Sequence, residues 1–445
     1  MATDMNSLGL SLFLLLAGIT LAGSRRAAAL ALMAGAVYLT QAQSLDVGGA
    51  HLSAMRLLNL AGALRIALRG ERPRTLQRLD VWVPLLYGYV VAVFFLRSPV
   101  DHAYVMGISI DAVLSYFVLR CLVNDAQALR SLLRGLVPLL IPFVVLLGME
   151  VVTGRNPFAA IGGLSFTERD GRLRGMGSFR HPSLLGTLGA ALAPLYIALW
   201  LHAKDRARAT IGLVLCAAII VAANSGGPVS AAVAGAVGWA LWPLRQKMRL
   251  VRRALIAMLL LLMAFMKAPI WYLPAKASAF SGGDGWHRSY LMEMAFRDIG
   301  QWWLAGMDLA RTRDWFDYQL SATGSADITN QYLYFGLTAG LAAMLIFLVV
   351  LTRAFHAVGQ AMHSSEERQA QQLAWGLGCC VAVHVATWLG ITYNFDQTYM
   401  LWSLPLAAAA SLAAGVPAAA AVLPTSTAAA PEPAPASAPA TELPW

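Results

Sequence analysis

Five arginines and one histidine lie close together between two apolar segments of this chain. They fall in residues 153–182, a stretch that includes the run GGLSFTERDGRLRGMGSFRHP, and they are Arg155, Arg169, Arg172, Arg174, Arg180 and His181. Guanidinium groups stay charged and bind phosphate oxygens in pairs. Such a cluster beside a membrane needs an anionic partner, so the stretch predicts a site for a lipid-linked phosphate or diphosphate.

A second set of candidate residues lies in a longer polar stretch, residues 273–328. Apolar residues at helical spacing predict a helix over residues 286–303 within it. Arg288 would then occupy the first helical turn, where free backbone N–H groups already favour anions. Arg288 is therefore a candidate phosphate clamp, and the alternative is an ion pair with Asp284 or Glu293.

The run Asp327–Ile328–Thr329–Asn330–Gln331–Tyr332–Leu333 leads directly into another apolar segment. Taken alone, Thr329 or Asn330 is best explained as the N-cap of the helix that follows.

Apolar helices must position all of these residues. Of 445 residues, 58% are hydrophobic and only 13% are charged, and the mean hydropathy is +0.61. A soluble domain carries about 25% charged residues, whereas a helix needs about 20 apolar residues to cross a bilayer. Apolar runs near that length cover residues 8–23, 27–42, 81–96, 103–123, 132–152, 184–201, 211–223, 229–242, 254–272, 332–351, 373–391 and 400–415. The predicted fold is an all-α polytopic membrane protein with about 12 transmembrane helices.

A further apolar stretch, residues 53–68, is interrupted by Arg56 and Arg65 and is a weaker candidate span. Residues 1–415 form one predicted transmembrane domain, and the Ala/Pro-rich residues 416–445 a disordered tail. The cysteines all lie in apolar segments and are interpreted as packing residues: Cys121, Cys216, Cys379 and Cys380.

The basic loops predict which side of the membrane each loop faces. The short basic loops are residues 69–78, 202–208, 245–253 and 353–372. The positive-inside rule places them in the cytoplasm. Four predicted spans separate the stretches 153–182 and 273–328, so both of these face the opposite side. Much of the net charge of +10 lies in these basic loops, where it can contact anionic lipid head groups. The charge therefore does not indicate that the protein binds nucleic acid.

Three landmarks, in order, carry a resemblance to a known family. Arg174–Gly175–Met176–Gly177–Ser178–Phe179–Arg180–His181–Pro182 opens one span. The long polar stretch has Trp286–His287–Arg288 near its start and Leu304–Ala305–Gly306–Met307 later, and Asn330–Gln331–Tyr332–Leu333 opens a span with spaced glycines. Residues 150–350 thereby resemble the O-antigen ligase/polymerase superfamily of bacterial envelope glycosyltransferases. Asn224–Ser225–Gly226–Gly227 is similar to the small-residue break that this family carries between two middle spans.

The resemblance implies a GT-C-type bundle in the bacterial inner membrane with its active site facing the periplasm. Members transfer a glycan from an undecaprenyl-diphosphate carrier to a sugar hydroxyl without metal or cofactor. The partners implied are an undecaprenyl-diphosphate-linked oligosaccharide, membrane lipids, and an acceptor that is either another glycan or lipid A core.

The resemblance also implies roles for particular residues. Arg174 and Arg288 would stabilise the charge that grows on the diphosphate leaving group. Asn330, Asp327 and His287 are the other catalytic candidates. Substrate-binding candidates are Arg169, Arg172, Arg180, His181, Thr329 and Tyr332.

One departure from the family bears on mechanism. O-antigen ligases carry a histidine where this chain has Thr329, and a threonine of ordinary pKa cannot act as a base at neutral pH. Asp327, His287, Asp284 or His181 would have to replace it, or leaving-group departure would dominate. The chain is therefore more similar to Wzy-type polysaccharide polymerases than to ligases, with the ligase as the alternative.

Two other classes of function compete. A transporter of an anionic lipid would use the arginine cluster as its binding site, but the sequence shows no internal repeat and keeps its charges in loops. A structural membrane protein would leave the arginine-rich loop without a partner.

Overall fold

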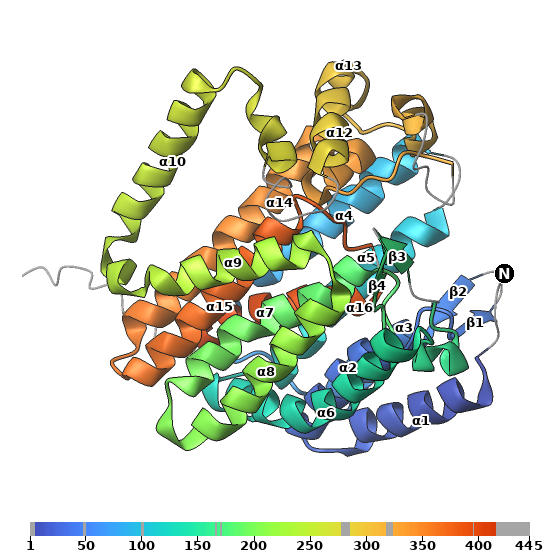
Figure 1. Cartoon of the computed structure of the whole chain (residues 1–445). Helices are drawn as coiled ribbons and strands as arrows, with labels where there is room; N and C mark the ends of the chain where they lie inside the picture. Colours follow the sequence, from blue (N-terminus) through green and yellow to red (C-terminus); the bar gives the residue numbers. More distant parts are fainter. Residues whose placement is uncertain are drawn as a thin grey trace, which may run out of the picture.

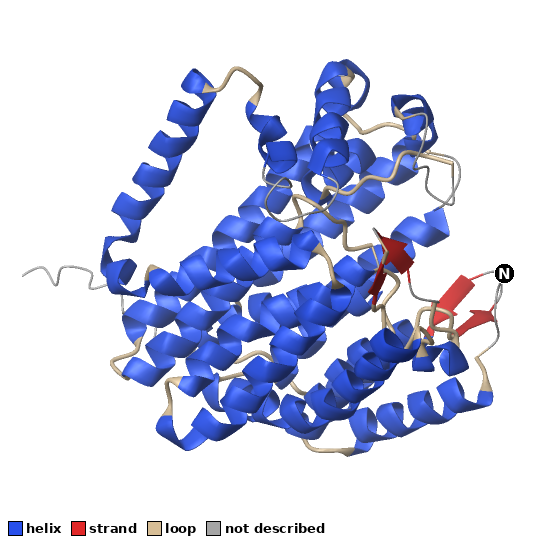
Figure 2. Cartoon of the chain, viewed as in Figure 1, coloured by secondary structure: helices blue, strands red, loops and turns tan. Residues whose placement is uncertain are grey.

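The computed structural model describes residues 5–47, 50–98, 102–164, 167–169, 171–276, 285–316, 324–394 and 396–414. Figure 2 shows that helices make up most of this part of the chain. The predicted all-α membrane fold is therefore confirmed at the level of class. Asp284 and the predicted tail at 416–445 lie outside the described residues.

Every apolar run predicted from the sequence contains a helix (Figure 1). The first six helices are α1 (Ser7–Ala22), α2 (Arg25–Tyr38), α3 (Ala54–Arg69), α4 (Leu79–Arg97), α5 (His102–Leu122) and α6 (Ala126–Thr153). The next are α7 (Pro182–Trp200), α8 (Arg206–Ala223), α9 (Gly226–Ala240), α10 (Met248–Phe265), α12 (Gly285–Arg297) and α13 (Ile299–Trp302). The last three are α14 (Gln331–Ser364), α15 (Arg368–Thr387) and α16 (Asp396–Ala414).

Two small antiparallel hairpins and short 3₁₀ turns complete the described chain. The strands β1 (Ser44–Val47) and β2 (Ala50–Ser53) pair with Ser44 opposite Ser53, and β3 (Thr167–Arg169) and β4 (Arg172–Arg174) pair with Thr167 opposite Arg174. The 3₁₀ turns are η1 (Pro157–Ile161), η2 (Ala203–Asp205), η3 (Trp242–Lys247), η4 (Ile270–Tyr272) and η5 (Leu309–Trp315). Both hairpins therefore lie in connections between helices.

The number of membrane spans differs from the expected twelve. Among the described residues, six helices are long and apolar enough to cross a membrane, or seven if the bent pair α10 and η4 is one span. Helices α1, α2 and α9 have 16, 14 and 15 residues, which at 1.5 Å per residue gives roughly 21–24 Å against a hydrocarbon core of ~30 Å. Apolar runs in the sequence predicted where these helices are, but not whether each crosses the bilayer.

The connections segregate to opposite ends of the bundle. In Figure 1 the turns that follow α7, α9 and α14 lie at the lower left, whereas α12 and the β3–β4 hairpin lie toward the opposite end. The first three turns are basic loops, and the last two elements belong to the arginine-rich stretch and the long polar stretch. The grouping of the loops inferred from charge and parity matches this arrangement.

Helix α10 stands apart from the rest of the bundle (Figure 1). None of its side chains is buried, and large apolar residues such as Ile256, Leu260 and Phe265 are exposed. A helix that is apolar yet unpacked is expected to contact lipid on most of its surface.

Arginines inside the bundle are neutralised by buried carboxylates. Arg120 pairs with Asp80 at 3.1 Å, and both side chains are almost fully buried. Arg56 pairs with Asp111 at 2.7 Å. A buried guanidinium without a partner would be strongly destabilising, so these pairs explain how charged residues are tolerated in apolar helices. They include Arg56, one of the two arginines that weakened the sequence prediction of α3.

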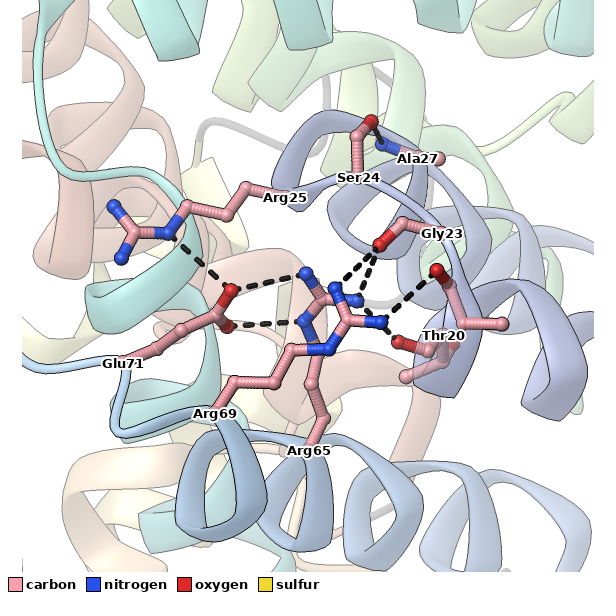
Figure 3. A network of polar contacts seen from close by, with 9 residues as sticks. Thr20, Gly23, Ser24, Arg25, Ala27, Arg65, Arg69 and Glu71 are labelled. Carbon is pink, nitrogen blue, oxygen red and sulfur yellow. Dashed lines mark hydrogen bonds and ion pairs between the residues drawn. The ribbon is translucent and has the colours of Figure 1, made fainter.

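The other interrupting arginine, Arg65, is the centre of a network at the turn between α1 and α2 (Figure 3). Its Nε and Nη2 atoms donate to the two Glu71 oxygens at 3.0 and 2.9 Å. Its Nη1 atom donates to the carbonyl oxygens of Thr20 and Gly23 at 2.8 and 2.7 Å. Cations favour a helix C-terminus, where carbonyl groups lack partners. Arg65 therefore joins the end of α1 to the loop after α3.

We expect Glu71→Gln to destabilise the protein and to flatten its acid sensitivity. Burial by itself raises the pKa of the Glu71 carboxyl, but the hydrogen bonds and charge of Arg65, helped by those of Arg25, outweigh burial and hold the pKa below its usual 4.5. A carboxyl whose pKa is lower in the folded than in the unfolded protein stabilises the folded state at pH values above the unfolded pKa. This stabilisation is lost as the pH falls through the folded pKa. Removing one partner of a buried pair costs about 3 kcal/mol.

Thermal unfolding in detergent between pH 7 and pH 3 measures both effects. The exposed Glu366→Gln is the control and should leave the midpoint and its pH dependence unchanged. Equal midpoints for the two variants at pH 7 would contradict the role assigned to Glu71.

A break in α14 holds the long polar stretch against the bundle. Ala339 and Gly340 have non-helical backbone angles, and Gly340 has a φ of 84°. The break frees groups that the helix would otherwise pair. The Met307 N–H donates to the Leu337 carbonyl at 2.7 Å, and the Leu341 N–H donates to the Trp303 carbonyl at 2.8 Å. The turn after α13 is thus hydrogen-bonded directly into a membrane helix.

Glycines make this approach possible. A Cβ atom on Gly340 would lie 2.4 Å from the Leu304 carbonyl oxygen, and one on Gly306 would lie 2.5 Å from the Leu337 carbonyl oxygen. One turn earlier in α14, a Cβ atom on Gly336 would meet the Trp302 ring at 2.8 Å. The Leu304–Ala305–Gly306–Met307 run and the spaced glycines of α14, both noted in the sequence, therefore contact each other.

Gly340→Ala should separate the polar stretch from α14 and lower the unfolding midpoint. The new methyl group would clash with backbone, and its positive φ alone costs roughly 1–3 kcal/mol. The control is Gly359→Ala in the same helix, where a Cβ meets nothing within 4 Å and alanine is favoured by about 1 kcal/mol. Because the four cysteines are buried, a thiol-reactive fluorescent dye reports unfolding on heating. The same midpoint for both variants would refute the interlock.

Candidate anion-binding site

The arginine-rich stretch is attached to the end of a membrane helix. Arg174 is the last residue of β4 and is buried, with 8% of its surface exposed. The next N–H group, of Gly175, donates to the carbonyl of Ala222 in the last turn of α8 at 2.9 Å. Asn224 Nδ2 donates to the Leu173 carbonyl at 3.4 Å. Arg174 therefore lies beside the junction of α8 and α9.

A buried carboxylate fixes the backbone that follows Arg174. The two oxygens of Glu150, near the end of α6, accept hydrogen bonds from the N–H groups of Met176 and Gly177 at 3.0 and 2.8 Å. Gly177 has a φ of 55°, which glycine adopts without strain. Glu150 thus fixes the turn that connects β4 to α7.

The starts of α7 and α9 are adjacent. His181 is the N-cap of α7, and its Nδ1 atom accepts from the Ser183 N–H at 3.1 Å. The Ser183 hydroxyl lies 2.9 Å from the Ser225 hydroxyl, and Ser225 is the N-cap residue of α9. The Ser225 side chain makes no capping hydrogen bond. Because a helix leaves its first N–H groups without intrahelical partners, the start of α9 retains donors for an anion.

The small-residue break before α9 gives this start its shape. Asn224 ends α8 in the left-handed conformation with a φ of 41°. Gly226 and Gly227 follow, so the first two residues of α9 add no side chain of their own. Their N–H groups are the donors of this turn, because Pro228 has none.

Arg288 reaches this break from the long polar stretch. It lies in the first turn of α12, as the sequence predicted. A Cβ atom on Gly390 would lie 2.8 Å from Cζ and Nε of Arg288, and one on Gly227 would lie 3.7 Å from Nη2. The guanidinium therefore lies over Gly390 and next to the start of α9. The backbone at Arg174 and the guanidinium of Arg288, separated in sequence by more than a hundred residues, both lie at the junction of α8 and α9.

A second group of candidates gathers around the segment before α14. The buried His287 ring stacks on Phe316 with centroids 4.4 Å apart. Its Nε2 atom lies 3.2 Å from the Asp327 carbonyl oxygen. In the neutral ring this contact makes Nε2 the donor, so Nδ1 is the nitrogen that can accept a proton. An imidazole from α12 is thereby placed beside the residues that precede Asn330.

Asn330 is the N-cap of α14. Its Oδ1 atom accepts from the N–H groups of Tyr332 and Leu333 at 3.0 and 3.1 Å, and the side chain is buried. Among the residues that the structure describes, its Nδ2 group has no hydrogen-bond partner. The capping interpretation is confirmed, and the cap also orients an amide donor that a ligand can use.

Asp327 remains a candidate base on its environment. Its side chain keeps contact with solvent, but partial burial raises the pKa of its carboxyl above the usual 3.8, an effect that the nearby His287 side chain only partly offsets. A carboxyl with a raised pKa is a better proton acceptor than an ordinary aspartate.

Two other candidates near Asn330 differ in their availability. The Tyr332 hydroxyl donates to the Val385 carbonyl at 3.1 Å, so it ties α14 to α15. The Thr329 hydroxyl oxygen is buried and has no hydrogen-bond partner within the described part of the chain. Of these two side chains, only Thr329 has an unused polar atom.

The remaining candidates lie on both sides of Arg174 in the arginine-rich stretch. Arg172 is exposed on β4, and His181 is exposed at the start of α7. Arg180 lines a separate cleft with Gln41 and Gly163. The backbone of Arg169 is in β3, and its side chain lies outside the described residues.

Sequence reasoning did not identify Glu150, Ser183, Ser225 or Gly390. Glu150 offered the clearest signal, since it is the one carboxylate in the apolar run 132–152. The two serines and Gly390 are common residue types, and only the packing of α7, α9 and α15 shows that they adjoin the site.

No profile of a known protein family matches the chain, and comparison with curated protein sequences gives no match.

We expect Glu150→Gln to loosen the turn after Arg174. The amide keeps one acceptor oxygen but turns an NH₂ group toward a backbone N–H, so one hydrogen bond to a charged group, worth about 1.5–3 kcal/mol, is lost. Hydrogen exchange of residues 174–178 in detergent should become faster. The matched control is the exposed Glu168→Gln in β3, and exchange that is equal in both variants would contradict the assignment.

Proposed function

We propose that this chain is a membrane glycosyltransferase that uses a polyprenyl-diphosphate-linked oligosaccharide as donor, and that it polymerises such repeats in the manner of Wzy-type enzymes. The observation that carries the proposal is the position of the Arg288 guanidinium next to the start of α9, where the backbone around Arg174 also lies. A guanidinium beside a helix N-terminus, with Arg174 as a second contributor, would form a positive site, and a diphosphate is a ligand whose charge fits it.

The chemistry of glycan transfer explains why such a site would be useful. Negative charge grows on the diphosphate as the bond between the anomeric carbon and the phosphate oxygen breaks. Fixed positive groups stabilise that charge more in the transition state than in the ground state. Arg174 and Arg288 would have this role, with the N–H groups at the start of α9 as further donors.

The second group of residues would handle the acceptor. As the acceptor oxygen attacks the anomeric carbon, its proton must be taken up by a base. His287, whose Nε2 atom contacts the Asp327 carbonyl oxygen, and the Asp327 carboxyl would be the candidate bases, and the Asn330 Nδ2 group would orient the acceptor hydroxyl. His287 would thus supply from α12 the imidazole that ligases carry at the position of Thr329.

The proposal includes topology and location. The fold would have about twelve spans of the GT-C type, with α1, α2 and α9 as short membrane helices and α15 and α16 as two further spans. The α12 end of the bundle would face the periplasm from the bacterial inner membrane. Membrane lipids would surround α10, and the carrier lipid would reach the site from the bilayer.

A ligase that transfers the glycan to lipid A core is the second candidate. The contact between His287 and Asp327 would serve a ligase as well as a polymerase, because it supplies a histidine despite Thr329. The acceptor therefore has to be identified by experiment.

Single-turnover transfer in proteoliposomes tests the proposal, with an undecaprenyl-diphosphate oligosaccharide as the only glycan. We expect a ladder of longer lipid-linked products from the wild type. Arg288→Gln should slow transfer by about 10²–10³, the loss typical when one transition-state donor is removed. The control is Arg297→Gln, which removes a charge from an exposed position of the same helix and should leave the rate unchanged.

The products separate the candidates. Transfer only after lipid A core is added would identify a ligase. Equal rates for Arg288→Gln and Arg297→Gln, or no transfer with either acceptor, would overturn the proposal.

A further inference from the structure

A cleft of about 250 Å³ lies outside the anion-binding site. One wall is the segment after α2, with Thr40, Gln41 and Ala42, and the other comes from the arginine-rich stretch. That second wall consists of Gly162, Gly163, Leu164, Ser178, Phe179 and Arg180. The cleft therefore joins the N-terminal helices to the segment that leads into α7.

Hydrogen bonds hold the two walls together. The Thr40 hydroxyl and Gln43 Nε2 both donate to the Ile161 carbonyl, the latter at 2.9 Å. The Ser178 hydroxyl donates to the Val37 carbonyl. Asn156 Nδ2 donates to the carbonyls of Leu164 and Gly177 at 2.7 and 2.8 Å. These hydrogen bonds fix the shape of the cleft in advance. Binding a ligand there would therefore cost little conformational entropy of the protein.

The lining combines polar groups with small apolar surfaces. Gln41 is half-buried and makes no hydrogen bond within the described residues. The N–H groups of Gly162 and Gly163 are hydrogen-bonded to Ala159 and Phe158, so the long polar side chains of the lining are those of Gln41 and Arg180. Typical small-molecule pockets have about 300–1,000 Å³, so this cleft has room for a ligand of about one ring. A sugar ring suits it, because hydroxyl groups match amide and guanidinium groups while the C–H face contacts Ala42 and Leu164.

We propose that this cleft binds a sugar ring of the glycan carried by the diphosphate lipid. Arg180 is followed directly by His181, the N-cap of α7, and Ser183 contacts Ser225 at the start of α9. Only two residues of the chain separate Arg180, which lines the cleft, from Ser183, which contacts the start of α9. A glycan attached to a diphosphate at α9 would therefore begin close to the cleft. The inference rests on the proposed function, since it takes the diphosphate site as the anchor of the lipid.

Binding to two lipids tests the assignment with the full chain in nanodiscs. The probes are undecaprenyl diphosphate and the undecaprenyl-diphosphate oligosaccharide isolated from membranes of the native host. One or two additional hydrogen bonds should make the wild type bind the glycan-bearing lipid about tenfold more tightly. Leu164→Trp, which adds an indole at the exposed edge of the cleft, should abolish this preference and leave the affinity for undecaprenyl diphosphate unchanged.

Two controls make the result specific. Val152→Trp adds the same ring at a highly exposed position outside the cleft and should retain the preference. Gln41→Ala, a smaller change, should reduce it partly. Equal affinity of the wild type for both lipids, or a preference that survives Leu164→Trp, would overturn the assignment of the cleft.

Failure of the underlying proposal gives a different result. If Arg288→Gln leaves the affinity for undecaprenyl diphosphate unchanged, the proposed diphosphate site would be refuted, whether or not the protein prefers the glycan-bearing lipid. If Arg288→Gln weakens binding of undecaprenyl diphosphate but the wild type shows no preference for the glycan-bearing lipid, only the assignment of the cleft would be refuted.

Discussion

The interlock between Gly306 and Gly340 is the contact on which the candidate site depends. A broken membrane helix exposes backbone groups that no lipid can satisfy, and the turn after α13 pairs with them at Leu337 and Leu341. This fixes α13, and through it α12, at one end of the bundle. The guanidinium of Arg288 can then rest over Gly390 rather than move with a solvent-exposed loop.

The membrane imposes a second constraint, because every charge within the bundle needs a partner. Asp80, Asp111 and Glu71 neutralise arginines, whereas Glu150 binds backbone N–H groups instead. That difference matters for function. Through its two backbone hydrogen bonds, Glu150 orders the turn that follows Arg174.

Much of the fold could be predicted from the sequence, since apolar runs mark helices. The number of spans could not, because helices such as α2 and α9 are too short to cross a bilayer by length alone. Part of the site was also predictable: Arg174, Arg288 and Asn330 stand next to turn or capping signals. The approach of Arg288 to the start of α9 was not, because it depends on glycine contacts at Gly227, Gly340 and Gly390 between segments far apart in the chain. A glycine in the sequence shows that space is needed but not which partner fills it.

The proposed chemistry requires an anion bound between Arg288 and the start of α9. A cryo-electron microscopy map of the protein in nanodiscs with undecaprenyl diphosphate would show whether one binds there. We expect phosphate density within hydrogen-bonding distance of the Arg288 guanidinium and the N–H groups of Gly226 and Gly227. Phosphate density at the basic loop after α9 instead, with the start of α9 empty, would contradict it.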